Sequence, residues 1–178
     1  MGRVLSRALE AAGLADLQTR VLSGTPLDEA ALSRLRDADL LLVAGLADSM
    51  RAHFRGDEVR VLKRKAEREP GLVLFTETAT HDGRTGAELL RELSLLRLRT
   101  APQQSIAVSM ETLGLELAQT ALLFGADTLI GDLQSERTLP LLDGAAARRR
   151  EVEGLVARSG RRARFADDTS ERSAEGAP

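Results

Sequence analysis

The sequence predicts an α/β fold in which parallel strands form a shortened, partial (β/α) barrel behind an N-terminal helical section. Three short apolar segments, at 71–75, 105–110 and 126–130, are separated by amphipathic segments of helical length. Strands joined through helices pair in parallel. A complete eight-stranded barrel takes about 250 residues, whereas this chain has 178. We therefore expect a helical section at 1–56, a partial barrel at 57–165 and a disordered tail at 166–178.

The helical section is expected to contain three amphipathic segments. Apolar spacing predicts a helix over 4–22, which Gly13 could divide into two shorter helices. A second helix is predicted over 26–36, with Thr25 as cap, Pro26 in the first turn and Asp28 completing the capping box. The segment 38–54 has the length and apolar stripe of a central packing helix.

Two strands are expected around the junction with the barrel section. Glu58–Leu62 alternates polar and apolar residues, which predicts a short exposed strand. The charged stretch Lys63–Pro70 predicts a solvated connection. The segment Gly71–Phe75 is apolar throughout and predicts a buried strand.

The region Thr85–Asp132 carries the clearest element boundaries. Thr85 and Glu88 form a capping box, and a leucine stripe follows as far as Pro102. Ser105–Met110 reads as a buried strand, 115–124 as a helix closed by Gly125, and Ala126–Ile130 as a further strand. We expect Leu72–Phe75 and Ile106–Ser109 to be parallel neighbours.

The C-terminal part is expected to add a helix over 145–159 and an edge strand at Arg161–Phe165. An incomplete barrel leaves strand edges whose backbone groups must be covered or paired. Either the N-terminal helices cover them or a second chain pairs with them. A homo-oligomer is thus an expected partner.

Composition narrows the function classes. The net charge is −2 and the pI is near 5.8, so no broad attraction to nucleic acid is expected. The basic runs Lys63–Lys65 and Arg148–Arg150, with Arg161, Arg162 and Arg164, would suit a phosphate or acidic partner, but the neighbouring glutamates predict a self-neutralising surface. The chain has no cysteine, which excludes disulfides and thiolate metal sites. Without a long apolar run, we expect a cytoplasmic protein that does not insert in a membrane.

Polar residues follow each predicted barrel strand, where parallel α/β folds place their functional groups. Their carboxylates, with the nearby histidine, would suit a divalent cation or a polar small molecule. The alternative is that they cap helices and face water, since their spacing is no metal signature. Neither histidine has a nucleophile at fixed spacing, so no catalytic residue and no resident metal are assigned. The candidate ligand-binding residues are Glu77, Thr78, His81, Ser109, Glu111, Thr112 and Asp132.

Two blocks of the chain resemble radical-SAM enzymes of futalosine-type menaquinone biosynthesis, the aminofutalosine synthase and dehypoxanthine futalosine cyclase group. One block resembles the segment before the family's cluster-binding loop, and its matching residues are Gly45–Asp48, Arg51, Gly56, Asp57 and Val59. The other resembles the C-terminal end of the family's barrel, although Met110 stands where a tryptophan is common. Its matching residues are Thr85–Glu88, Ser94–Leu98, Ile106–Ser109, Thr112, Gly114, Gln119, Ala121, Leu122 and Phe124–Asp127.

The resemblance implies ancestry without the family's chemistry, because its C-x3-C-x2-C motif has no counterpart in a chain without cysteine. We therefore expect a non-catalytic, cofactor-free binding or accessory protein linked to menaquinone biosynthesis. Its expected partners are a second copy, a full-length paralogous radical-SAM enzyme or a small-molecule ligand. The alternative is a small-molecule or metal-dependent enzyme that uses the rim carboxylates.

Overall fold

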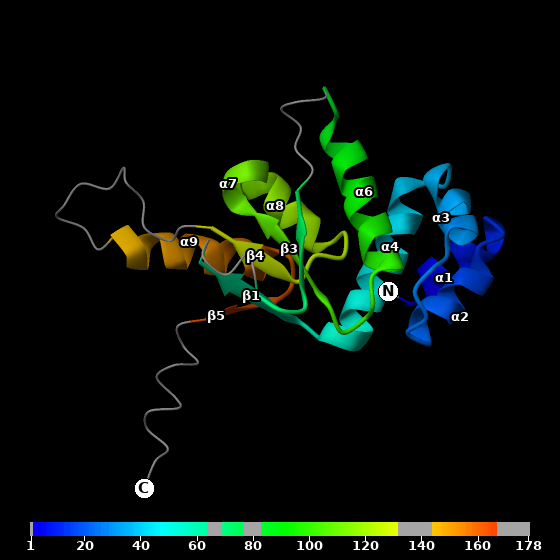
Figure 1. Cartoon of the computed structure of the whole chain (residues 1–178), viewed down its shortest axis with the longest axis horizontal. Coiled ribbons are helices and arrows are strands. Elements are labelled where there is room, and N and C mark those ends of the chain that lie inside the picture. Colours follow the sequence, from blue (N-terminus) through cyan, green and yellow to red (C-terminus); the bar gives the residue numbers. More distant parts are fainter. Residues whose placement is uncertain (1, 64–68, 77–82, 132–143, 167–178) are drawn as a thin grey trace, which may run out of the picture.

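The chain forms a five-stranded, all-parallel sheet with interleaved helices and a group of helices at its N-terminal end (Figure 1). This architecture comes from a computed structural model, which describes residues 2–63, 69–76, 83–131 and 144–166. The predicted α/β class with parallel strands is confirmed. The tail from 167 onward and the centre of the charged connection, 64–68, lie outside the described residues.

The N-terminal section contains the helices α1 (Gly2–Ala11), α2 (Ala15–Leu22), α3 (Glu29–Arg36) and α4 (Leu40–Arg55). Gly13, with φ of 69°, separates α1 from α2, so the alternative of two shorter helices holds.

The predicted start of the next helix at 26 is wrong. The cap of α3 is Asp28, whose Oδ1 accepts a hydrogen bond from Ala31 N at 2.9 Å. Because Asp28 has an extended backbone, the residues before it cannot belong to the helix.

The sheet has the strand order β2-β3-β4-β1-β5. The strands are β1 (Glu58–Leu62), β2 (Leu72–Phe75), β3 (Ser105–Ser109), β4 (Thr128–Ile130) and β5 (Arg162–Phe165). Leu72 pairs with Ser105 and Phe75 with Val108 in parallel register, which confirms the expected neighbours. The strand β5 is an edge strand, also as predicted.

The described part of the chain after the N-terminal section contains the helices α6 (Gly86–Arg99), α7 (Met110–Leu113), α8 (Leu115–Leu122) and α9 (Gly144–Arg158). The predicted capping box opens α6. Thr85 Oγ1 accepts from Glu88 N at 3.3 Å, and the Glu88 carboxylate accepts from Thr85 N at 2.6 Å. The parallel connections β2-α6-β3 and β3-α7-α8-β4 match the strand–helix–strand pattern expected from the sequence.

Two expectations about burial are wrong. Glu58–Leu62 is an interior strand between β4 and β5, with Val59 and Val61 at most 2% exposed. Its polar residues alternate because they lie on the second face of the sheet, not because the strand is exposed. Conversely, β2 is an edge strand, and Leu72, Val73 and Leu74 are only half-buried.

The two faces of the sheet differ in what covers them. One face packs with α4, α6, α8 and α9 into the main hydrophobic core, where it contributes Val61, Val108 and Leu129. On the other face, called here the open face, the described apolar cluster consists of strand residues alone: Leu62, Leu72, Leu74, Ala107 and Ile130. Helices on one face of a parallel sheet are the arrangement of a (β/α) barrel wall.

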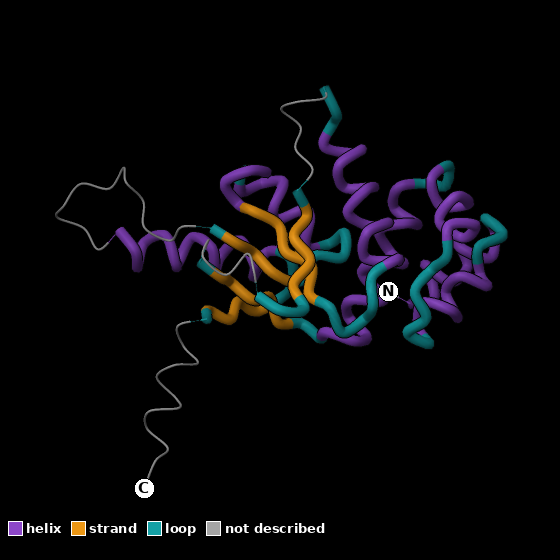
Figure 2. Tube along the Cα trace, in the orientation of Figure 1, coloured by secondary structure: helices purple, strands orange, loops and turns teal. Residues whose placement is uncertain are grey.

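A second hydrophobic core joins the N-terminal helices to the sheet domain. In Figure 2 the helices α4 and α6, drawn in purple, stand between the orange strands and the helices α1–α3. Buried leucines of α2 and α3 meet Leu46 on α4 and Leu98 on α6. The helix α4 therefore contributes to both cores, as the prediction of a central packing helix requires.

Candidate functional site

The carboxyl end of β3 holds three of the sequence-predicted site residues. Ser109 ends the strand and caps α7, where its Oγ accepts a hydrogen bond from Thr112 N at 3.2 Å. Glu111 and Thr112 are exposed on the same helical turn. Glu77, Thr78, His81 and Asp132 lie outside the described residues, so the convergence of these side chains with Glu111 stays a prediction.

A cavity among the described residues lies elsewhere, on the open face at the carboxyl half of β1 and β5. It has a volume of about 390 Å³ and is lined by Arg60, Leu62, Glu69, Arg164, Phe165 and Ala166. Since β1 and β5 are parallel neighbours, this cavity lies at the strand ends where α/β folds commonly bind ligands. We refer to it as the β1–β5 cavity.

The charged groups of the β1–β5 cavity are held by two ion pairs of different quality. Arg60 Nη2 contacts both carboxylate oxygens of Glu69, at 2.7 and 2.9 Å. Arg164 Nη1 is 3.5 Å from the Glu58 carboxylate, and both of these side chains are at least half exposed. Arg60 is therefore held firmly, whereas Arg164 is held loosely.

The sequence contains a signal for this cavity that differs from the strand-end carboxylates. Glu58-Val-Arg-Val-Leu62 and Arg162-Ala-Arg-Phe165 both alternate charged and apolar residues. In adjacent parallel strands such alternation places the charges on one shared face. The neighbouring glutamates predict a self-neutralising surface around Arg161, Arg162 and Arg164. That prediction does not include the pairing of Arg164 with Arg60.

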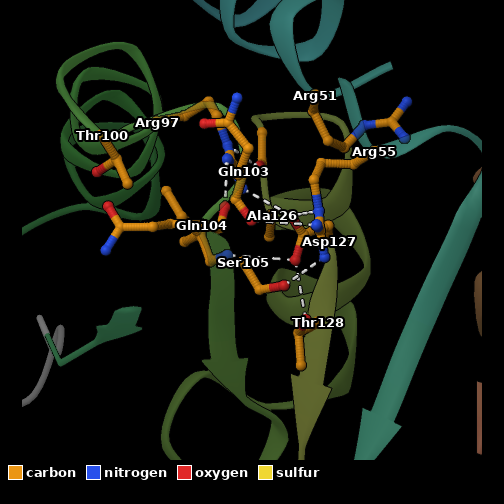
Figure 3. A network of polar contacts seen from close by, with 12 residues as sticks. Arg51, Arg55, Arg97, Thr100, Gln103, Gln104, Ser105, Ala126, Asp127 and Thr128 are labelled. Atoms are coloured by element: carbon orange, nitrogen blue, oxygen red, sulfur yellow. Dashed lines mark hydrogen bonds and ion pairs between the residues drawn. The ribbon is translucent and has the colours of Figure 1, made fainter. Parts of the chain in front are cut away.

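A buried polar network lies at the opposite, amino end of the strands (Figure 3). Arg97 on α6 donates through Nη2 to Asp127 Oδ2 at 2.8 Å and through Nε to Gly125 O at 2.9 Å. Asp127 Oδ1 accepts from Ile106 N at 3.2 Å and from Thr128 Oγ1 at 2.8 Å. Burial lowers the pKa of Arg97, and the charge of Asp127 partly restores it.

A second buried arginine joins α4, α8 and β5. Arg161 donates to the carbonyl oxygens of Leu122 and Ala126 and to the Asp48 carboxylate. The pKa of Arg161 is lowered to about 10, mainly by burial and to a smaller extent by repulsion from Arg51. These contacts tie helices to strands at the amino end of the sheet, the end where barrel folds hold structural rather than catalytic residues. Arg161 is thus a structural residue and not part of a basic surface.

The remaining sequence candidates have ordinary surroundings. His53 is exposed on α4, and the centroid of its ring lies 4.6 Å from that of Phe54 in an edge-on arrangement. Arg148 and Arg149 pair with Glu151 and Glu153, in agreement with the predicted self-neutralising surface. Across the described ranges, no three acidic or histidine side chains are grouped to hold a metal ion. None of the helices in those ranges has the length and apolarity to cross a bilayer.

Comparison of the chain with protein-family models, with curated proteins and with solved structures gives no match.

Proposed function

We propose that this chain is a relative of the menaquinone radical-SAM enzymes that has no cluster and serves as a non-catalytic binding or accessory protein. The observation that carries the proposal is the parallel pairing of β1 with β4, with Arg60 beside Thr128 and Leu62 beside Ile130. Of the two blocks that resemble the family, one ends in β1 and the other ends at Asp127, immediately before β4. In a closed barrel the first and last strands are neighbours, and here the first strand, β1, lies between the last two described strands of the chain, β4 and β5.

The distribution of the described helices over the two faces of the sheet supports the same proposal. All helices that contribute to the main core pack on one face, as on the outside of a barrel. The open face then corresponds to the barrel interior, where ligands of such folds enter from the carboxyl ends of the strands. The β1–β5 cavity provides a binding site at that end, and the absence of cysteine from the sequence removes the ligands of the family's cluster.

Reconstitution with iron and sulfide under anaerobic conditions tests the loss of the cluster. The expected product is a colourless protein without bound iron. A brown protein with a cluster absorption band would overturn the proposal.

Calorimetric titration with futalosine-type nucleosides tests the binding role, with chromatography of the mixture to detect turnover. We expect binding without conversion. Ala166→Trp fills the cavity and should weaken nucleoside binding at least tenfold. Ala157→Trp, on the exposed side of α9, should leave nucleoside binding unchanged. Failure of every such nucleoside to bind, or equal effects of the two variants, would contradict the proposed role.

We also propose that a second copy pairs with the β2 edge. Leu72–Phe75 contains no charge, whereas the β5 edge carries Arg162 and Arg164, and charged edge strands resist pairing. Sedimentation equilibrium should show a dimer that Leu74→Lys dissociates and Arg162→Glu does not. If the wild-type protein is a monomer at high micromolar concentration, this part of the proposal is contradicted. A full-length paralogous radical-SAM enzyme is the alternative partner.

The alternative function is a small-molecule or metal-dependent enzyme that uses rim carboxylates. The exposure of Glu111 at the carboxyl end of β3 favours it, and Glu77 and Asp132 are its further candidates. Melting temperatures measured with Mg²⁺ and Mn²⁺ test it. A metal-dependent rise that Glu111→Gln abolishes would favour this alternative, and unchanged melting would rule against it.

A further inference from the structure

We infer that Arg60 and Arg164 form a binding site for the oxyanion of a small molecule, a carboxylate or a phosphate monoester, in the β1–β5 cavity. This inference gives the ligand class for the proposed binding role and rests on that role.

The first observation is the register of the two strands. Arg60 on β1 is paired with Arg164 on β5, so their side chains leave the same face of the sheet from strands roughly 4.8 Å apart. Like charges in directly opposite positions destabilise a sheet. An anion placed between the two guanidinium groups would relieve this repulsion.

The second observation is how these charges are balanced without a ligand. Among the described residues that line the cavity, two arginines and one glutamate are charged, so this part of the lining has a formal charge of +1. Both contacts of Glu69 are made to a single nitrogen of Arg60, and the contact from Glu58 to Arg164 is long at 3.5 Å. Guanidinium groups bind carboxylates and phosphates best through two nitrogens at once. A ligand oxyanion can therefore make better contacts than the protein's own carboxylates make with Arg164.

The third observation is the size of the site. A volume of about 390 Å³ is in the lower part of the range of small-molecule pockets, which begins at roughly 300 Å³. Leu62, buried at 2% exposure, forms an apolar wall beside the charged groups. A metabolite with one anionic group and a small planar or apolar body fits this combination. A polymeric anion is disfavoured, because the whole chain carries a net charge of −2.

The inference is tested by calorimetric titration of the full chain with inorganic phosphate, adenosine monophosphate and benzoate, with adenosine as the uncharged control. We expect at least one of the three anions to bind and adenosine to bind at least tenfold more weakly. Phosphate and adenosine monophosphate report a phosphate site, and benzoate reports a carboxylate site.

Arg164→Gln should weaken anion binding at least tenfold. The matched control is Arg162→Gln, which removes the same charge from the same strand and face, outside the cavity lining. Circular dichroism melting verifies that both variants are folded. Absence of binding by all three anions, or equal losses in the two variants, would overturn the inference.

The nucleoside titrations separate this inference from the proposed function. Nucleoside binding that is unaffected by Arg164→Gln would overturn the oxyanion site and leave the binding role intact. Anion binding that depends on Arg164 together with no nucleoside binding would support the site and contradict the link to menaquinone biosynthesis.

Discussion

Arg97 and Asp127 form an ion pair of 2.8 Å in which neither side chain is more than 2% exposed. The pair joins α6 to the residue that precedes β4, and it also fixes the start of β3 through the hydrogen bond from Ile106 N. Asp127 therefore has a structural role at the amino end of the sheet, where it connects α6, β3 and β4.

Replacing Asp127 with asparagine is expected to destabilise the fold by about 3 kcal/mol or more, because it leaves the buried Arg97 charge uncompensated. Asp16→Asn is the matched control. It breaks an ion pair with Arg34 of the same length, but that pair is exposed, so a much smaller loss is expected. Urea denaturation measures both, and equal losses would contradict the structural role of the buried pair.

Gly125→Ala should destabilise the protein by about 2 kcal/mol or more. The alanine would have to adopt a left-handed backbone conformation, and its methyl group would overpack the surrounding core. Gly125 has φ of 103°, and an added Cβ would lie 2.9 Å from Cβ of Arg97. Gly154→Ala is the control in α9, where the added methyl meets nothing within 4 Å. Thermal melting should show a loss of unfolding free energy for Gly125→Ala. For Gly154→Ala it should show a gain of up to about 1 kcal/mol.

Thr85→Ala should cost about 1 kcal/mol of unfolding free energy because it removes the N-cap of α6. Thr120→Ala removes a threonine hydroxyl that bonds to Glu116 O inside α8, where alanine is the better helix former. The control should therefore lose no stability. Equal losses in the two variants would show that the cap contributes nothing specific.

The same cap makes stability depend on pH. Hydrogen bonds from Thr85 N and Oγ1 hold the pKa of Glu88 below its ordinary value of 4.5. In the unfolded chain the carboxyl group regains its ordinary pKa, so its contribution is complete above that value. The contribution is lost as the pH falls through the lowered, folded-state pKa.

Glu88→Gln should consequently flatten the decline of unfolding free energy in acid. Urea denaturation at a series of pH values from 7 to 3 measures the effect, with the wild-type protein alongside. A decline as steep as that of the wild type would show that other carboxyl groups dominate the acid dependence.

Local chemistry made several elements predictable. The capping box of Thr85 and Glu88, the break at Gly13 and the apolar segments 72–75 and 105–109 are each set by neighbouring residues, and each is present as expected. The start of α3 was misplaced because two residues, Thr25 and Asp28, were both suitable caps. Choosing between them needs the backbone conformation, which the sequence pattern does not supply.

The candidate site was less predictable than the elements. The sequence placed polar groups after each strand, and Ser109, Glu111 and Thr112 do follow β3. It did not place Arg60 beside Arg164, because these residues are about a hundred positions apart and their strands are neighbours only through the sheet order.

By itself the sequence determined the class of fold, because helix and strand periodicity and the caps are local properties of the chain. Only the tertiary structure decided that β1 is a central strand and that β2 lies at an edge. That choice made Glu58–Leu62 an interior strand and brought Arg60 into register with Arg164. The physical reason is that strand order follows from how the helices pack together on one face, and this packing depends on contacts between residues far apart in the chain.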